Sequence, residues 1–151
     1  MTITPIIKTA DVKAPPDRAF ALFTEHMVDW WPNRMTIGAG PPEAIVIEPR
    51  AGGRWFERSA DGAECGWGRV LAWEPPHRLL LAWQIDANFK YDPDFETELE
   101  MTFAAHGTGA RVTLEHRNLD RFGDSAARLA DMLRGGWSGI IDGYATLADT
   151  L

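Results

Sequence analysis

The C-terminal stretch Ser125–Leu151 decides the fold, and it reads SAARLADMLRGGWSGIIDGYATLADTL. Its apolar residues recur at the three- and four-residue spacing that places side chains on one face of a helix. They are Ala126, Leu129, Ala130, Leu133, Trp137, Ile140, Ile141, Tyr144, Leu147 and Ala148. Asp124 or Ser125 can cap the first turn. The pattern predicts one long helix whose apolar face must be covered by another part of the chain.

The residues before this helix form short runs with the alternation that is typical of strands. Turn signals separate these runs, among them Asp61-Gly62, Pro75-Pro76 and Gly107-Thr108-Gly109. The predicted strands are Ile3–Val12, Ala44–Glu48, Arg54–Ser59, Cys65–Glu74, Arg78–Asp86, Glu96–Ala105 and Ala110–Asn118. Because short turns join most of them, we expect antiparallel pairs.

A shorter helical stretch follows the first strand. Pro16 and Asp17 favour its start, since proline fits the first turn and an acidic residue complements the helix dipole. The stretch ends near Trp31, because the residue before Pro32 is pushed out of the helical region. This order of elements predicts a single α+β domain over residues 1–151, with helices on one face of an antiparallel sheet.

The composition is that of a globular domain with 151 residues, of which 45% are hydrophobic and 25% charged. The net charge of −7 argues against nucleic acid or an anionic membrane as partner. Cys65 is the one cysteine, so neither an intrachain disulfide nor a cysteine-based metal site is expected. Met1–Ala10 lacks a signal-peptide pattern, and no apolar run is long enough to span a membrane. We therefore expect a cytoplasmic protein.

Seven tryptophans are the unusual feature of the composition. They are Trp30, Trp31, Trp55, Trp67, Trp73, Trp83 and Trp137. Each brings a large apolar surface and one N–H donor. Two interpretations stay open: the tryptophans fill a bulky core, or several of them line a ligand pocket on one concave surface.

Alternation assigns an inner face to the later strands, because successive side chains of a strand point to opposite sides. Together with the last helix, these strands supply the first group of candidates for lining a cavity. They are Leu81, Trp83, Met101, Phe103, Leu114, His116, Leu133, Trp137 and Ile141.

The first predicted hairpin is ambiguous. Trp55 and Glu57 share a face, and Trp67 shares one with Arg69, but Phe56 competes with Trp55 for the interior. If the tryptophans face inward, both charged residues would face an apolar interior, where an unpaired charge is costly. They could be a solvated pair at the rim of the sheet or a polar anchor for a ligand. Trp55, Glu57, Trp67 and Arg69 complete the cavity candidates.

Signatures of catalysis and of metal binding are weak. His116 could be a satisfied core or rim residue, or a ligand-binding or acid–base residue, since histidine titrates near neutral pH. His26, His77 and His106 show no metal-ligand spacing, and we expect neither a metal nor a cofactor. There is no Gly-x-Ser-x-Gly elbow, and no activating partner is predictable for Cys65. We therefore assign no catalytic residue.

Several segments together resemble a known superfamily. They are Val12-x-Ala14-Pro15-Pro16-x-x-Ala19-Phe20-x-Leu22-Phe23, Trp30-Trp31-Pro32, Gly52-Gly53-Arg54-Trp55, Gly68-x-Val70-x-x-Trp73-Glu74-Pro75-Pro76-x-Arg78-Leu79 and Gly136-Trp137. With them the chain resembles the START-like (SRPBCC, Bet v-type) superfamily, and within it the activator of heat-shock protein 90 ATPase homologue 1-like branch. The resemblance covers essentially the whole chain.

This resemblance implies a helix-grip fold, in which a curved antiparallel sheet wraps around the long C-terminal helix and two short helices follow the first strand. It also implies a cavity between sheet and helix that accepts lipids, polyketides or other apolar compounds. Some members are cyclases, aromatases or hydrolases, but they share no catalytic set that could be carried onto this chain. The co-chaperones that name the branch usually have an additional domain, which we do not expect here.

Our leading hypothesis is a binder of a small hydrophobic or aromatic molecule in that cavity, without established catalysis. One alternative is an enzyme of the polyketide cyclase/aromatase type that uses Glu57, Arg69 and His116 as acid–base and orienting groups. It requires these three side chains to converge in one cavity. Another alternative is a co-chaperone-like activator of a heat-shock protein ATPase, with a chaperone as partner. The sequence leaves the oligomeric state open.

Overall fold

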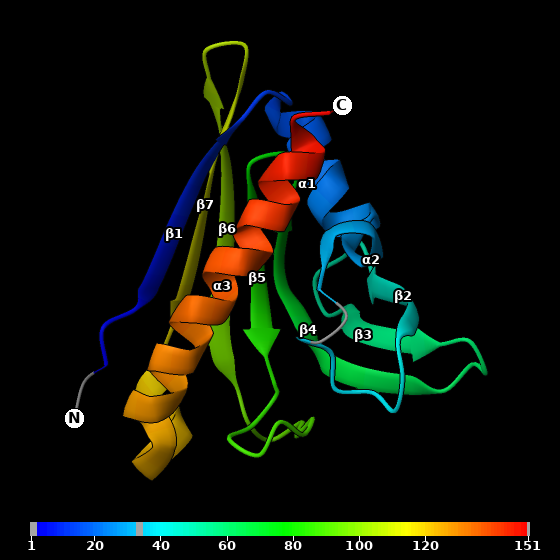
Figure 1. The fold of residues 1–151 in the computed structure, drawn as a ribbon, viewed down its shortest axis with the longest axis vertical. Helices are drawn as coiled ribbons and strands as arrows, with labels where there is room; N and C mark the ends of the chain where they lie inside the picture. Colours follow the sequence, from blue (N-terminus) through cyan, green and yellow to red (C-terminus); the bar gives the residue numbers. More distant parts are fainter. Residues whose placement is uncertain (1–2, 33–34, 151) are drawn as a thin grey trace.

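Within residues 3–32 and 35–150, which the computed structural model describes, the chain folds into a seven-stranded sheet with helices against one face (Figure 1). The helices are α1 (Pro16–Glu25), α2 (Met27–Trp30) and α3 (Ala126–Ala148), with a 3-10 helix, η2 (Leu119–Ser125), before α3. The strands are β1 (Ile6–Val12), β2 (Pro42–Ile47), β3 (Arg54–Ser59), β4 (Glu64–Glu74), β5 (Arg78–Trp83), β6 (Thr97–His106) and β7 (Gly109–Arg117). The predicted α+β class is confirmed.

The sheet is antiparallel throughout and follows the order β1-β7-β6-β5-β4-β3-β2. From β2 to β7 each strand pairs with the next one in sequence, while β1 returns to pair with β7, so that Ile6 lies opposite His116. The sheet curls, and its β2 edge comes to lie beside α2 (Figure 1). This is the helix-grip arrangement that the resemblance implies.

Helix α3 lies across the inner face of the sheet (Figure 1). Leu129, Trp137 and Ile140 of its apolar stripe are each no more than 3% exposed. The long helix predicted from the sequence is confirmed apart from its ends; Leu151, its last predicted residue, lies outside the described residues. Burial of this stripe against the sheet explains why the segment decides the fold.

The helical stretch predicted after β1 is split at His26, whose backbone torsions (φ −127°, ψ 28°) are not helical. Phe20 and Phe23 of α1 face the core, and the ring of Phe23 lies 5.8 Å from that of Tyr144 in α3. The Tyr144 hydroxyl donates a hydrogen bond of 2.6 Å to the carbonyl oxygen of Ala19. Helix α1 thereby closes one end of the core.

Strand β5 is shorter than predicted, because it ends at Trp83 rather than at Asp86. Trp83 lies opposite Thr97, the first residue of β6, so the ladder has no further partner. The next residues instead form their own small loop, closed by an isolated bridge between Ile85 and Tyr91. Ile85 and Phe89 of this loop border a pocket beside the core.

Candidate functional site

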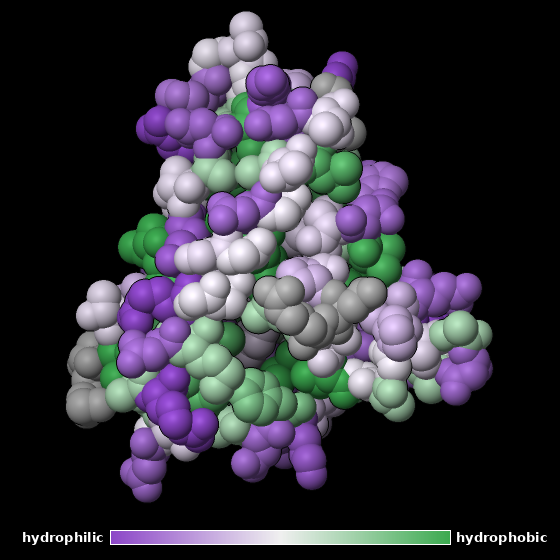
Figure 2. All heavy atoms as spheres, viewed as in Figure 1, coloured by the Kyte–Doolittle hydropathy of each residue, from purple (hydrophilic) through white to green (hydrophobic). Residues whose placement is uncertain are grey.

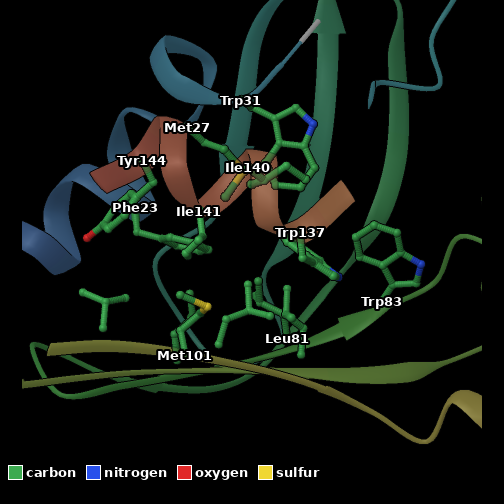
Figure 3. Packing of buried hydrophobic residues seen from close by; sticks show 14 of the residues in the cluster. Phe23, Met27, Trp31, Leu81, Trp83, Met101, Trp137, Ile140, Ile141 and Tyr144 are labelled. Atoms are coloured by element: carbon green, nitrogen blue, oxygen red, sulfur yellow. The ribbon is translucent and has the colours of Figure 1, made fainter. Parts of the chain in front are cut away.

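Five tryptophans form a closed ring of contacts at one end of the described core. Ring centroids are separated by 5.0 Å (Trp31–Trp67), 5.4 Å (Trp67–Trp55), 5.9 Å (Trp55–Trp83), 5.6 Å (Trp83–Trp137) and 5.7 Å (Trp137–Trp31). Figure 3 shows Trp31, Trp83 and Trp137 together at the end of the cluster away from Phe23 and Tyr144. We call these five residues the tryptophan ring. Four of these pairs are edge-to-face and one is tilted, and aromatic pairs at such distances each contribute about 0.5–1.5 kcal/mol beyond the burial of their area.

A pocket of about 330 Å³ lies beside the tryptophan ring. Its walls come from α3, from the end of β5 with the loop that follows, and from the segment 35–37. The lining residues include Trp31, Trp83, Ile85, Leu133, Trp137 and Ile140, and no charged side chain occurs among the described residues that line it. Figure 2 shows apolar side chains around a hollow in the lower half of this face, beside α3. The tryptophans therefore agree with both interpretations of the sequence. Trp55 and Trp67 fill the core, and Trp31, Trp83 and Trp137 line a pocket.

The three tryptophans that line the pocket present ring surface rather than N–H groups. The Nε1–H of Trp31 donates to the carbonyl oxygen of Met35 at 3.2 Å, and that of Trp83 donates to the carbonyl oxygen of Ile85 at 3.2 Å. The Nε1–H of Trp137 donates to Nδ1 of His116 at 3.1 Å. Since each indole donor is satisfied within the protein, the aromatic faces are left for a ligand.

Two other hollows, of about 500 and 510 Å³, flank α1. One is lined by Arg18, His26 and Asp29 among others, and the second lies between α1, β2 and Trp73. They are larger, but the tryptophan ring does not border them. A small-molecule site is typically apolar and aromatic with few polar groups, so the pocket beside the ring is the candidate site.

His116 is fully buried beneath this pocket and anchors Trp137. Because Nδ1 accepts the indole N–H of Trp137, the proton of the neutral imidazole lies on Nε2, which donates to Oγ1 of Thr97 at 2.8 Å. The Thr97 hydroxyl can donate onward to the carbonyl oxygen of Trp83 at 3.5 Å. These hydrogen bonds link the indole of Trp137 in α3 to Thr97 and Trp83 of the sheet.

Burial lowers the pKa of the His116 imidazole from 6.5 to about 3. The ring is therefore neutral at physiological pH, and both of its nitrogens are occupied by partners inside the protein. A general acid or base needs a proton within reach of the substrate and a pKa near the working pH. His116 has the surroundings of a core residue that holds its neighbours in place.

Glu57 is buried on the inner face of β3, with 2% of its surface exposed. Its Oε1 accepts hydrogen bonds from the backbone N–H of Ile37 at 2.8 Å, the backbone N–H of Gly38 at 3.0 Å and Nε1–H of Trp67 at 2.8 Å. Three donors offset the cost of burying a carboxyl group. Since Ile37 lines the pocket, Glu57 fixes one pocket wall to the sheet.

Gly38 makes this contact sterically feasible. A Cβ atom at this position would lie 2.6 Å from Oε2 of Glu57, closer than side-chain carbons approach oxygen. The glycine thus lets the backbone come close enough to donate to the carboxyl group.

Arg69, a cavity candidate whose direction the sequence left open, does not face the interior. Its side chain is half exposed and pairs with Glu96 at 2.6 Å on the outer face of the sheet. The cause is a β-bulge: Trp55 lies opposite Gly68 and Phe56 opposite Gly66, which leaves Trp67 as an extra residue. The bulge turns Trp67 inward, so the residue two positions later points outward.

The proposed enzymatic set therefore does not converge. Glu57 and His116 lie on the inner face, each with its hydrogen bonds made inside the protein, while Arg69 lies on the opposite face. No other acid–base set was predicted from the sequence.

The remaining cavity candidates lie on the inner side of the sheet, and they include Trp55 and Trp67, whose direction the sequence left open. Leu133 joins Trp83 and Trp137 in the lining of the pocket. The others are buried in the core near it: Trp55, Trp67, Leu81, Met101, Phe103, Leu114 and Ile141.

Sequence reasoning missed the pocket residues that come from loops. Met35 and Ile37 lie in a segment without periodicity, and Phe89 lies in the loop between β5 and β6. The signal available in the sequence was an unusual one: a large aromatic residue, Phe89, inside a loop of polar residues and turn formers.

Cys65 lies opposite Glu57 in the ladder and is a free thiol. Burial raises the pKa of this thiol, and the nearby Glu57 raises it further by a smaller amount. A thiol that is protonated at neutral pH is a poor nucleophile. Cys65 therefore gives no support to covalent catalysis.

Within the described ranges, no three His, Cys, Asp or Glu side chains are grouped so that they could hold a metal ion. None of the helices that the structure describes combines the length and the apolar character needed to cross a membrane.

The glycines of α3 differ in their surroundings: Gly135 and Gly139 are exposed, Gly136 borders the pocket, and Gly143 lies close to the carbonyl oxygen of Trp30. We expect Gly139→Ala to raise the free energy of unfolding by about 0.5–1 kcal/mol, because alanine favours a helix and the added Cβ meets no atom within 4 Å. In Gly136→Ala the same gain should be reduced, since the Cβ would lie 2.5 Å from Cε of Met35. Urea unfolding of both variants measures the difference; equal gains would contradict it.

Comparison with known proteins places this fold in a family. The model of the family described as Activator of Hsp90 ATPase homolog 1-like protein matches residues 13–149. Among curated proteins no significant match is found.

Solved structures give matches over nearly the whole chain. An anthrahydroquino-gamma-pyrone synthase, Txn09, is 33% identical over 99% of this chain and 98% of its own, with a TM-score of 0.65. CalC from Micromonospora echinospora, a self-sacrificing resistance protein, is 31% identical over 97% of this chain and 94% of its own, with a TM-score of 0.73.

The Aha1 dimer from Colwellia psychrerythraea is 13% identical over 97% of each chain, with a TM-score of 0.66, which shows the shared fold alone. The branch that the sequence motifs indicated is thus supported by the family model and by the solved structures. The chain belongs to the Activator of Hsp90 ATPase homolog 1-like protein family.

Proposed function

We propose that this protein binds a small, flat, apolar or aromatic molecule in the pocket beside the tryptophan ring. The observation that carries the proposal is the lining: three tryptophans present ring faces to a pocket of about 330 Å³, and their N–H groups are used elsewhere. That volume falls within the range of about 300–1,000 Å³ that is usual for small-molecule sites.

Two relatives above 30% identity were found, and the one that is named for an aromatic compound supports a link to ligands of that class. One is described as a synthase of an anthrahydroquino-gamma-pyrone, and the other as a resistance protein. The structure of this chain offers a binding surface rather than a convergent set of acid–base groups. We therefore propose binding as the activity. We also propose a cytoplasmic location for the protein, because the free thiol of Cys65 is compatible with a reducing compartment.

Titration with N-phenyl-1-naphthylamine tests the proposal. This neutral aromatic probe brightens in apolar surroundings and accepts excitation from tryptophan, so binding near the tryptophan ring should quench Trp emission as probe emission rises. We expect saturable binding in the micromolar range. A matched variant, Leu133→Gln, places an amide in the lining and should weaken binding several-fold while the far-ultraviolet circular dichroism spectrum is unchanged.

An absence of saturation would contradict the proposal, as would a Leu133→Gln variant that binds with the affinity of the wild type. In the first case the chaperone partner, the alternative that the family name raises, would become the leading explanation. An ATPase assay with a heat-shock protein 90 chaperone would then test it.

A further inference from the structure

Phe89 is an exposed aromatic residue at the edge of the pocket. Its side chain is 47% exposed, yet it lines the pocket together with Met132 of α3, which is 44% exposed. These two side chains lie at the side of the pocket that faces solvent. A large apolar ring that stays exposed next to an apolar pocket is unusual, because covering it would be favourable.

The backbone at Phe89 is strained. Its φ is 60°, the left-handed region that bulky side chains rarely adopt. The other described non-glycine residue with positive φ is Asn118, a residue type that tolerates this region. Strain in a large aromatic residue next to a pocket is the kind of outlier from which a functional hypothesis can start.

The loop holds Phe89 in this conformation by several hydrogen bonds. The N–H of Phe89 donates to the carbonyl oxygen of Asp86 at 3.0 Å, and the N–H of Asp86 donates to the carbonyl oxygen of Lys90 at 2.9 Å. Oδ1 of Asp86 also accepts from the N–H groups of Asn88 and Lys90 at 2.9 and 3.1 Å. This is a three-residue hairpin loop, in which the left-handed position is usually taken by glycine.

The ring of Phe89 is loosely packed on its other side as well. Besides the main pocket, Phe89 lines a small gap of about 10 Å³ together with Leu129, Leu133 and Phe122. The strained turn therefore directs the ring toward the pocket without locking it against α3.

We propose that Phe89 is a ligand-contacting residue that covers the solvent side of the pocket and stacks on a bound planar molecule. This inference rests on the proposed function and adds the residue that selects flat aromatic ligands. The bound molecule then lies between the tryptophan faces on the inside and the ring of Phe89 on the outside. The turn at Asp86–Lys90 supplies the direction of approach.

The test compares variants of the full chain in titrations with N-phenyl-1-naphthylamine. Phe89→Ala and Phe89→Gly should each bind the probe about tenfold more weakly, the factor expected for loss of one aromatic contact. Phe89→Tyr keeps the ring and should bind within twofold of the wild type. Phe89→Leu keeps apolar bulk without a flat face and should fall between these limits.

Thermal unfolding without ligand measures the cost of the backbone conformation at residue 89 separately from the contribution of the Phe89 ring to binding. Phe89→Gly should melt about 2–4 °C above Phe89→Ala, because only glycine accepts a φ of 60° without cost. Tyr91→Ala is the matched control: Tyr91 is an exposed aromatic of the same loop, 40% exposed, that contacts Gly66 rather than the pocket. This variant should bind the probe as the wild type does.

Wild-type affinity in Phe89→Ala would overturn the inference while leaving the proposed function intact. An equal loss in Tyr91→Ala and Phe89→Ala would also overturn it, because the cause would then be the loop as a whole. Failure of the wild type to bind the probe would instead count against the proposed function, and with it against this role of Phe89.

Discussion

Replacing Glu57 with leucine is expected to lower the free energy of unfolding by about 3–5 kcal/mol. The substitution removes the acceptor of three hydrogen bonds and leaves the N–H groups of Ile37, Gly38 and Trp67 without it. In a domain of this length such a loss lowers the melting temperature by roughly 10 °C. Urea unfolding followed by circular dichroism measures it without relying on tryptophan emission close to the mutated site.

Two further variants separate the contribution of the hydrogen bonds of Glu57 from that of its size. Glu57→Gln keeps one acceptor oxygen and should lose only about 1–2 kcal/mol. Trp67→Phe removes one of the three donors, so the double variant Glu57→Leu/Trp67→Phe should lose less than the sum of the single losses. Strict additivity would show that the hydrogen bond between the two residues contributes nothing.

Hydrogen exchange at Ile37 and Gly38 reports locally on their hydrogen bonds to Glu57. In Glu57→Gln the amides of Ile37 and Gly38 should exchange with deuterium faster than in the wild type, because their acceptor is weaker. Two results together would contradict this role of Glu57: unchanged exchange at these two amides, and a Glu57→Leu variant as stable as the wild type. They would show that Glu57 does not hold this wall of the pocket.

The elements that sequence patterns predicted well are the regular ones. Leu81, Phe103 and Leu114 lie on the inner face because β5, β6 and β7 pair without a bulge over those positions, so a period of two holds along each strand. Helix α3 was predictable for the same reason: its stripe keeps one period from Ala126 to Ala148. Both patterns report a local repeat that burial then reinforces.

Arg69 shows where this reasoning fails. A bulge changes the period by one residue, and the bulge at Trp67 arises from pairing with β3 that the sequence of β4 does not reveal. The partners of Glu57 were equally hidden, because two of them are backbone N–H groups of Ile37 and Gly38, which carry no side-chain signature. A sequence pattern gives the face of a residue but not the partner across the fold.

The pocket itself combines segments that are far apart in sequence. Trp31, Phe89 and Leu133 come from the end of α2, the loop after β5 and α3. Alternation gave the inward direction of Trp83, and helical spacing gave that of Trp137, but neither pattern gives a distance between elements. The resemblance to a superfamily supplied that arrangement, and the tryptophan ring shows how much of the interior is filled.

The stability of the protein is expected to fall as the pH drops from about 6.5 toward 3, with His116 contributing up to about 1.4 kcal/mol per pH unit. Burial lowers the pKa of His116 in the folded state to about 3, whereas in the unfolded chain the imidazole has its ordinary pKa of 6.5. Between these values the unfolded state binds one more proton than the folded state, so acid favours unfolding. Above pH 6.5 both states hold a neutral ring, and this contribution to the pH dependence disappears.

The measurement is a series of urea unfolding curves between pH 7.5 and 4.5 for the wild type and for His116→Gln. Glutamine offers a donor and an acceptor to Thr97 and Trp137 but does not titrate. The variant should be less stable at pH 7.5, yet its stability should fall less steeply with acid, by up to one proton in the slope. Carboxyl groups that titrate in this window contribute to both curves and cancel in the difference.

Identical slopes for the two proteins would mean that His116 takes up its proton over the same pH range in the folded and unfolded states and that Trp137 is held in another way. A shallower slope in His116→Gln, with probe affinity at pH 7.5 reduced as well, would instead tie the buried imidazole to the pocket. In that case the histidine acts on ligand binding only through the indole that it orients. A catalytic acid or base would produce a different result: the variant would keep its affinity for the probe and lose turnover alone.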